Sequence, residues 1–289
     1  MTLPRFDDTA PRDVPAIDAQ DGKTIARLVA VMQRLLAEDG CPWDREQTLL
    51  TLRKYVLEEA CEVIDAIDSG DRAALREELG DLLLQIVFQA ELARREHAFA
   101  IDDVVESIVH KLVSRHPHVF GDATAADADA VLRNWEKLKA KEKGERGVLG
   151  GVPRSLPGLT RAQRVGEKVS RVGFDWEAAR GSRAKVHEEL GELERAIDAG
   201  DDAAIEEELG DTLFAIVNLA RHTRVDAEGA LRGTTDKFIH RFAHVEARVR
   251  EKHGGFGTSA VLPLAELDGY WEEAKADERA KKARPGGER

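Results

Sequence analysis

Apolar side chains recur at steps of three and four residues along most of the chain, which is the spacing of one face of an α-helix. A first pattern begins at Thr24 and stops at Gly40 and Pro42. A second pattern starts near Thr48, and its apolar stripe consists of Leu57, Cys61, Ile64 and Ile67. We expect a helix for each pattern and a stripe that faces a hydrophobic core.

The sequence "DSGD" separates this second helix from the next one. Gly70 can take the left-handed conformation that ends a helix, and the Asp71 carboxylate can cap the helix that follows. The stripe then continues through Leu75, Leu79, Leu82, Ile86 and Val87. We therefore expect an antiparallel helical hairpin, followed by helices from about Ile101 to Arg115 and from about Ala130 to Lys141.

The same hairpin pattern occurs twice in the chain. "AIDSGDRAALREELGDLLL" from Ala66 and "AIDAGDDAAIEEELGDTLF" from Ala196 are identical at 13 of 19 aligned positions. A match of this length at one fixed offset indicates a duplicated structural unit. The apolar stripes of the second copy are Val186, Leu190, Leu193 and Ile197, then Ile205, Leu209, Leu213 and Ile216.

Glycine and proline mark the boundary between the copies. The segment "KGERGVLGGVPRSLPG" contains five glycines and two prolines and cannot sustain a helix. The predicted organisation is a flexible N-terminal extension (1–22), a first helical module (23–143), a linker (144–158), a second helical module (159–277) and a flexible tail (278–289).

Composition narrows the protein class. Aromatic residues make up only 5% of the 289 residues, which favours an all-α protein of two tandem helical bundles over a β-sheet protein. A formal net charge of -12 argues against binding duplex nucleic acid. The two cysteines are too few for a disulfide framework, and no apolar run is long enough to span a membrane. We expect a cytoplasmic protein without a membrane partner.

Acidic residues stand three apart on both helices of each hairpin, so each pair projects from one helical face. Four converging carboxylates would repel one another, by about 4 kcal/mol per pair at 4 Å and an effective dielectric near 20. Such a cluster needs cations, and an all-oxygen set suits Mg²⁺, with Mn²⁺ as a possible substitute. The predicted metal ligands are Glu59, Glu62, Glu78 and Asp81 in the first copy and Glu189, Glu192, Glu208 and Asp211 in the second.

The acidic pairs allow two other interpretations. A single Glu-x-x-Glu pair is usually a solvated face, but two pairs around a tight turn, repeated in a second module, favour a metal site. A di-iron bundle needs Glu-x-x-His motifs, and the chain has none. Neighbouring glutamates, Glu58, Glu77, Glu188 and Glu207, could orient ligands or act as a base for water. The predicted catalytic set is Glu188, Glu189, Glu192, Glu208 and Asp211.

Basic and aromatic residues recur in a similar way. Each copy has a Lys-x-x-x-Arg frame and, further on, a Trp followed four residues later by Lys. Next to an acidic metal cluster, these residues would hold the phosphates and stack on the base of a nucleotide, although each pair alone is more often structural. They are Lys111, Arg115, Trp135 and Lys139, then Lys237, Arg241, Trp271 and Lys275. His116 and His118 are interpreted as loop residues.

These motifs resemble the MazG family of nucleoside triphosphate pyrophosphohydrolases, whose mark is Glu-x-x-Glu, a turn, then Glu-x-x-Asp. The stretches "GCPWDREQT", "ELGDLL", "RHPHVF", "PRSLP", "VGFDW" and "FAIVNLARH" are similar to two-module members. The resemblance runs from about Thr24 to Asp277. It implies an all-α nucleotide pyrophosphatase fold, Mg²⁺ dependence, cleavage of nucleoside triphosphates to monophosphate and pyrophosphate, and a homodimer.

By the same resemblance, the metal ligands are the four carboxylates of the second copy, and Lys185, Lys237, Arg241 and Trp271 touch the nucleotide. Lys185 aligns with Tyr55 of the first copy, which carries no charge, so the second module is the favoured catalyst. Two alternatives stay open. One is a module that senses a nucleotide or binds a protein without turnover, and the other is a sibling enzyme specific for one biosynthetic nucleotide.

Overall fold

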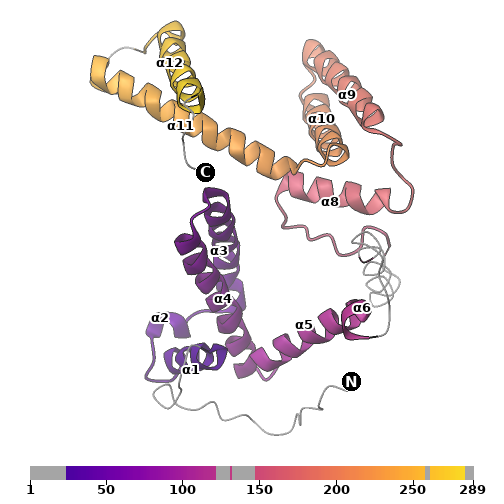
Figure 1. Cartoon of the computed structure of the whole chain (residues 1–289), viewed down its shortest axis with the longest axis vertical. Coiled ribbons are helices and arrows are strands. Elements are labelled where there is room, and N and C mark those ends of the chain that lie inside the picture. The colour runs from indigo at the N-terminus through magenta and orange to yellow at the C-terminus, as the bar shows by residue number, and fades with distance from the viewer. Residues whose placement is uncertain (1–23, 122–130, 132–146, 258–260, 284–289) are drawn as a thin grey trace. The chain divides into compact units, whose positions relative to one another are not determined.

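The computed structural model describes residues 24–121, 131, 147–257 and 261–283 (Figure 1). Its described residues form helices and no strands, as predicted. The chain divides into two compact units, residues 1–142 and 143–289. The predicted extension (1–22) and most of the helix predicted over 130–141 lie outside the described residues.

The first unit is built around a hairpin of two long helices, α3 (Leu49–Ser69) and α4 (Arg72–Arg95). Helices α1 and α5 pack against α4. The core lies where α1, α3 and α4 meet, and Met32, Leu52 and Val87 are each 1% exposed there. The remaining helices of this unit are α1 (Ile25–Leu35), α2 (Pro42–Arg45), α5 (Ile101–Arg115) and α6 (Pro117–Phe120).

The hairpin turn follows the predicted chemistry in both units. Gly70 and Gly200 end their helices in the left-handed region, with φ of 74° and 68°. The Asp71 carboxylate accepts hydrogen bonds from the backbone of the next helix, and Asp201 does the same in the second unit. These caps supply partners for amides that a helix start leaves unpaired. The turns therefore fix where the acidic residues on either side lie.

The second unit repeats the hairpin with α9 (Ala179–Ala199) and α10 (Asp202–His222), and α8 (Gly158–Ser170) packs against α10. Helix α11 (Ala227–His253) packs against α12 (Leu264–Ala283) and against α8. Val245, Val249 and Tyr270 form a small separate core between α11 and α12. Helix α12 continues to Ala283, so the predicted tail begins as helix, because its Ala, Lys, Arg and Glu residues favour that state.

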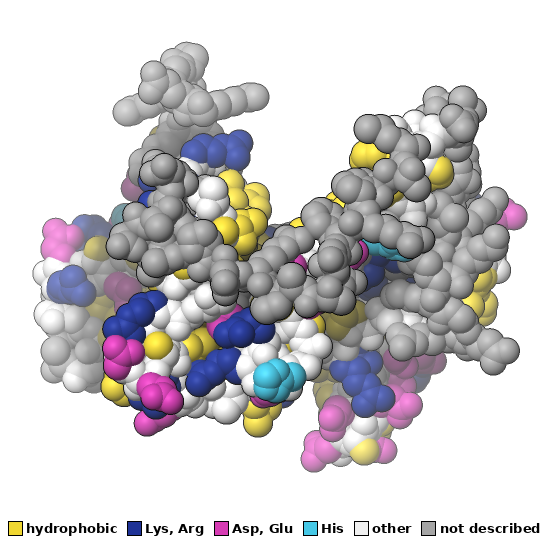
Figure 2. All heavy atoms as spheres, turned by 90° about the horizontal axis from the view of Figure 1, so that it is seen from below, with side chains coloured by type: hydrophobic (Ala, Val, Ile, Leu, Met, Phe, Trp, Pro, Cys, Tyr) yellow, Lys and Arg dark blue, Asp and Glu magenta, His cyan; other side chains and the backbone are white. Residues whose placement is uncertain are grey.

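The predicted burial of the hairpin stripes is wrong for many of their residues in a single chain, although Val87 is buried as predicted. Leu57 and Ile67 are each 57% exposed, Ile197 is 55% exposed, and Leu209 is 48% exposed. Figure 2 shows that apolar side chains also reach the surface on the face it presents. The exposed stripe residues are open to solvent or to a further partner.

Among the described residues, every helix is too short or too polar to cross a membrane.

Candidate functional site

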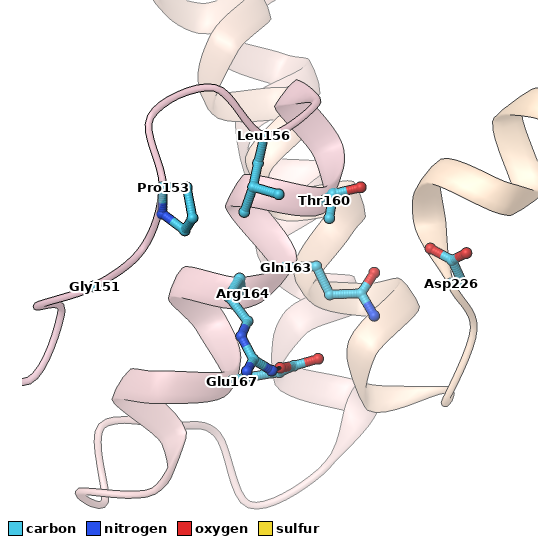
Figure 3. Close-up of a pocket in the computed structure, with 8 residues that line it drawn as sticks. All are labelled: Gly151, Pro153, Leu156, Thr160, Gln163, Arg164, Glu167 and Asp226. Atoms are coloured by element: carbon cyan, nitrogen blue, oxygen red, sulfur yellow. Dashed lines mark hydrogen bonds and ion pairs between the residues drawn. The ribbon is translucent and has the colours of Figure 1, made fainter. Parts of the chain in front are cut away.

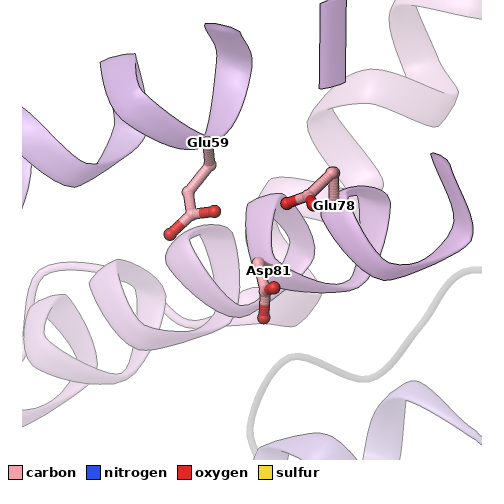
Figure 4. A group of neighbouring side chains, drawn as sticks. All are labelled: Glu59, Glu78 and Asp81. Carbon is pink, nitrogen blue, oxygen red and sulfur yellow. The ribbon is translucent and has the colours of Figure 1, made fainter. Parts of the chain in front are cut away.

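The hairpin of the first unit brings three of its four predicted carboxylates together. Glu59 comes from α3, whereas Glu78 and Asp81 come from the facing helix α4 (Figure 4). One ligand oxygen from each side chain lies within 4.8 Å of the others. The capped turn sets this register, because it places the acidic steps of the two helices level with one another.

Electrostatics in this first trio favours a bound cation. Partial desolvation raises the pKa of Glu59, and the nearby negative charges of Asp81 and Glu62 raise it further. The pKa of Glu78 is raised by desolvation and by Glu62 and Asp81. Like charges that raise one another's pKa values store repulsion that a divalent ion would relieve.

The second unit forms the same trio from Glu189 on α9 and Glu208 and Asp211 on α10. Glu189 is only 5% exposed. Desolvation raises the pKa of Glu208, and the charges of Glu192, Glu189 and Asp211 add to that effect. The second unit therefore concentrates negative charge around a more deeply placed ligand.

The fourth predicted ligand of each set lies at the edge of its trio. Glu62 and Glu192 are outside the groups within 4.8 Å, yet both act electrostatically on their neighbours. Glu192 lies 3.3 Å from Arg195 on the same helix. Their position suits a ligand that joins the site when an ion is present.

Lys185 is the feature that separates the two sites. Its Nζ atom lies 2.8 Å from a carboxylate oxygen of Glu188 and 2.8 Å from one of Glu189. Hydrogen bonds to Glu188 and then to Glu189 raise the pKa of the Lys185 ammonium group. The aligned Tyr55 instead packs against the core of the first unit and meets the Trp43 ring edge to face. Within the described parts of the chain, it is the second trio that has a lysine bonded to one of its carboxylates.

The predicted nucleotide-contacting residues on α11 and α12 lie together. The Arg241 guanidinium is 5.6 Å from the Trp271 ring centre and pairs with Glu278 at 2.7 Å. The ring of Phe238 lies 4.8 Å from that of Trp271, and Phe238 is 56% exposed. Lys237 shares this helix, and Lys275 pairs with Glu272 on α12.

Within the chain, this group is not brought to the acidic trio. Lys237 lies about 15 Å along α11 from its start at Ala227, and Asp211 lies about 16 Å from the end of α10. Lys237 and Asp211 would lie side by side if α11 folded back along α10. The contact between these two helices is small, so α11 does not lie along α10. The cations and the carboxylates therefore sit on separate parts of the second unit.

Two of the four residues of the first unit that were predicted to contact a nucleotide lie within the described residues. Lys111 and Arg115 both lie on α5, which packs against α4. Trp135 and Lys139 lie outside the described residues. His116 connects α5 to the short α6 and is a loop residue as predicted, whereas His118 lies within α6, so the loop prediction is wrong for His118. The two rings lie 5.6 Å apart.

The trios fit a hard divalent cation. Carboxylate oxygens converge from two helices, and among the described residues no histidine or cysteine belongs to either trio. Mg²⁺ and Mn²⁺ prefer such all-oxygen sets, and Mg²⁺ retains positions for water and phosphate oxygens. The arrangement can therefore hold a cation whose remaining positions face a phosphorylated ligand.

One polar cluster contains none of the predicted site residues. Asp175, from the loop before α9, receives two hydrogen bonds from Arg221 at 2.8 and 2.5 Å and lies 3.0 Å from His222. The hydrogen bonds from Arg221 lower the pKa of Asp175. The cluster ties the end of α10 to the loop that leads into α9. Its residues lie within "VGFDW" and "FAIVNLARH", two stretches noted only for their family resemblance.

A cavity in the second unit is lined by residues that belong to neither trio. It has a volume of about 500 Å³ and lies between α8, the segment before it and the start of α11 (Figure 3). Thr160 and Gln163 on its wall are already bonded to the start of α11, through Glu228 and the Ala227 amide. Arg164 pairs with Glu167 at 2.7 Å. These bonds indicate a structural joint between α8 and α11.

Comparison with known proteins links both hairpins to one family. The sequence profile of the "MazG nucleotide pyrophosphohydrolase domain" matches residues 47–120 and 180–246. The chain is 44% identical over 256 residues to "Nucleoside triphosphate pyrophosphohydrolase/pyrophosphatase MazG" of Thermotoga maritima, covering 88% of this chain and 96% of that protein.

Two further relatives are both called "Nucleoside triphosphate pyrophosphohydrolase". The protein from Escherichia coli K12 is 44% identical over 260 residues, which covers 88% of this chain and 98% of that protein. The protein from Mycobacterium tuberculosis is 40% identical over 165 residues, which covers 56% of this chain and 50% of that protein.

Proposed function

The chain belongs to the MazG family of nucleotide pyrophosphohydrolases, and on this premise we propose that it hydrolyses nucleoside triphosphates to the monophosphate and pyrophosphate. The observation that carries the proposal is the trio Glu189, Glu208 and Asp211, with the Lys185 ammonium group beside it. Clustered oxygen ligands next to a fixed cation suit a polyphosphate that arrives with a divalent metal ion. The second module is the proposed catalyst.

In this mechanism, Glu189, Glu208 and Asp211 would hold Mg²⁺ or Mn²⁺, and Glu192 would join them. Such an ion, when bound, would supply positive charge for the phosphate oxygens and lower the pKa of a bound water. Glu188 lies next to this set and would accept a proton from the water that attacks one of the two phosphorus atoms joined by the α–β bridging oxygen. The P–O bond from that phosphorus to the bridging oxygen breaks, which releases the monophosphate and pyrophosphate. Lys185 then exchanges its contacts with Glu188 and Glu189 for a phosphate oxygen.

The phosphates and the base are held by residues of α11 and α12. Lys237, Arg241 and Lys275 bind phosphate oxygens, and Arg241 gives up its bond to Glu278 to do so. Trp271 stacks on the base, and every base offers a π face for such a contact. We therefore propose broad base tolerance and a role in removing unwanted nucleotides from the cytoplasmic pool.

A second copy of the chain completes the proposed site. The apolar stripes of the hairpins are exposed, and α11 carries the cations away from the carboxylates of its own hairpin. A homodimer that packs one hairpin on another would bury these stripes and bring the two groups together. The expected mass in sedimentation equilibrium is that of a dimer, and a monomer at all concentrations would contradict this part of the proposal.

The test of the chemistry is a product assay. The protein is incubated with deoxynucleoside triphosphates and Mg²⁺, and pyrophosphate and orthophosphate are measured separately. The proposal predicts pyrophosphate and monophosphate in equal amounts, and an Asp211→Asn variant that folds but turns over substrate far more slowly. Release of orthophosphate would refute the cleavage position, whereas nucleotide binding without turnover in either protein would indicate a sensing module.

A further inference from the structure

A small cavity of about 250 Å³ lies between α11 and α12, and none of its lining residues belongs to a carboxylate trio. Its walls combine imidazole and carboxylate groups, with two alanines between them. The histidines, His240 and His244, come from α11, and Asp277 and Glu278 come from α12. This mixture of nitrogen and oxygen donors differs from the all-oxygen trios.

The two histidines stand four residues apart, which places both imidazoles on one face of α11. Two histidines at this spacing on a helix are suited to binding one transition-metal ion between them. The small side chains of Ala243 and Ala274 leave the space between the helices unfilled, and Ala274 is only 6% exposed. The cavity is therefore lined by two small apolar side chains and by four side chains that carry donor atoms.

One imidazole already has the outer contact that metal-binding histidines usually show. The Nε2 atom of His244 lies 3.4 Å from a carboxylate oxygen of Glu273, and Arg248 holds Glu273 at 2.9 Å. A carboxylate partner on one ring nitrogen orients the ring and leaves the other nitrogen available for a metal. His244 can therefore present Nδ1 to an ion.

The residues that line the cavity differ in whether they already have a bonding partner. Glu278 is bonded to Arg241, whereas His240 and Asp277 make no hydrogen bond or ion pair within the described parts of the chain. Both His240 and Asp277 are exposed, so their side chains can rotate. Among the described residues, the groups whose ligand atoms already lie within 4.8 Å of one another are the two trios. The side chains of His240, His244 and Asp277 must therefore rotate before their ligand atoms can meet at one ion.

We propose that His240, His244 and Asp277 form a second metal site, selective for zinc-like divalent ions over Mg²⁺. Two imidazole nitrogens and one carboxylate oxygen match the donor preference of Zn²⁺, Co²⁺ and Ni²⁺, whereas Mg²⁺ prefers oxygen alone. The ion would join α11 to α12, whose shared buried core is small. Binding to the folded state alone would stabilise this pair of helices.

The experiment measures zinc bound to the full-length chain by equilibrium dialysis and atomic absorption. The chain is first treated with chelator and is then kept in excess Mg²⁺, which occupies the carboxylate trios. We expect one zinc ion per chain, with affinity reduced roughly tenfold or more in His240→Asn and His244→Gln and by a similar factor in Glu273→Gln. His110→Gln, on the exposed face of α5, is the matched control and should bind zinc as the unaltered chain does.

Two results would overturn the site. One is the absence of zinc binding at micromolar metal in excess Mg²⁺. The other is zinc binding that is unchanged in the His240 and His244 variants but lost in Asp211→Asn, which would place zinc at the carboxylates. Circular dichroism checks that each variant is folded. Pyrophosphate release in Mg²⁺ alone is measured separately, so that failure of the zinc site and failure of the proposed hydrolysis are distinguishable.

Discussion

The two hairpins share their carboxylates but differ in the charge beside them. In the second, Lys185 contacts Glu188 and Glu189, whereas the aligned Tyr55 in the first packs into its own core. Both trios have raised pKa values, at Glu59 and Glu78 in the first and at Glu208 in the second. Both copies therefore carry the carboxylate trio, while among the described residues the lysine bonded to a trio carboxylate belongs to the second copy.

A second difference lies where the hairpins are anchored. Position 91 of α4 is a glutamate that is 4% exposed and bonded to Arg94, and Gln33 of α1 lies 3.4 Å away. The aligned position of α10 is Arg221, which binds Asp175 of the loop before α9. Charges of opposite sign hold equivalent helix ends to different neighbours. In the second unit this anchor fixes the loop that leads into α9, the helix that carries Lys185.

The largest expected effect separates the two trios directly. Asp211→Asn should lower kcat/KM for a nucleoside triphosphate by roughly 10²–10³-fold, because the metal loses a ligand charge that acts in the transition state. Asp81→Asn, the matched change in the first unit, should lower it by less than about threefold. Pyrophosphate release under saturating Mg²⁺ is the measurement. Equal losses in both variants would mean that the trios act as one system.

The next effect tests the cation that distinguishes the sites. Lys185→Tyr imports the first-unit residue and should reduce kcat/KM by about 10–100-fold, since a charged hydrogen bond contributes about 1.5–3 kcal/mol. The reciprocal Tyr55→Lys change, made in the Asp211→Asn background, should restore part of the turnover. Steady-state kinetics at several salt concentrations measures both. A Lys185→Tyr variant with unaltered kinetics would remove the basis for favouring the second module.

Sequence alone predicted much of this comparison. The helix-turn-helix order followed from apolar spacing and from Gly70 and Asp71, since these depend on local backbone chemistry. The grouping of Glu189, Glu208 and Asp211 followed from helical spacing on both sides of a fixed turn. The contrast between Lys185 and Tyr55 was visible by aligning the repeats.

Long-range placement was harder to predict. An apolar stripe shows which face of a helix avoids water, but not whether its cover comes from the same chain, and Leu57 and Ile197 are exposed. The small contact between α10 and α11 leaves no local pattern in the sequence, and neither does the pairing of Asp175 with Arg221. Each depends on contacts between distant segments. A charged residue late in an apolar helix, such as Arg221, was the available signal for that anchor.

A third prediction compares the anchors. Arg221→Gln should reduce the free energy of unfolding by about 2 kcal/mol, because it removes two charged hydrogen bonds to Asp175 in a mostly buried setting. Glu91→Gln should cost less, about 1 kcal/mol, because its partner Arg94 is half exposed and can be solvated. Urea unfolding of the full chain measures both. A larger loss for Glu91→Gln would reverse the assignment of the stronger anchor.

The smallest effect concerns a property that both hairpins share. Glu208 and Glu78 have pKa values above the ordinary 4.5 of glutamate, so folding favours their protonated forms. Between that value and the raised pKa, the folded state binds more protons than the unfolded state, and stability falls as pH rises. Above the raised pKa the penalty is fully present, and below 4.5 it is absent.

Glu208→Gln removes this penalty, and Glu78→Gln does the same in the first unit. In chelator, each variant should therefore gain melting temperature relative to the unaltered chain as pH rises from about 4 to 7, with little difference at the acidic end. Added Mg²⁺ should reverse the ranking, because only the unaltered trio retains its full charge for the ion. Thermal melts across this pH range, with and without Mg²⁺, measure the effect. If a variant instead loses stability relative to the unaltered chain as pH rises in chelator, the prediction is wrong. The carboxylate charges would then already be compensated without metal, by Lys185 in the second unit or by solvent in the first.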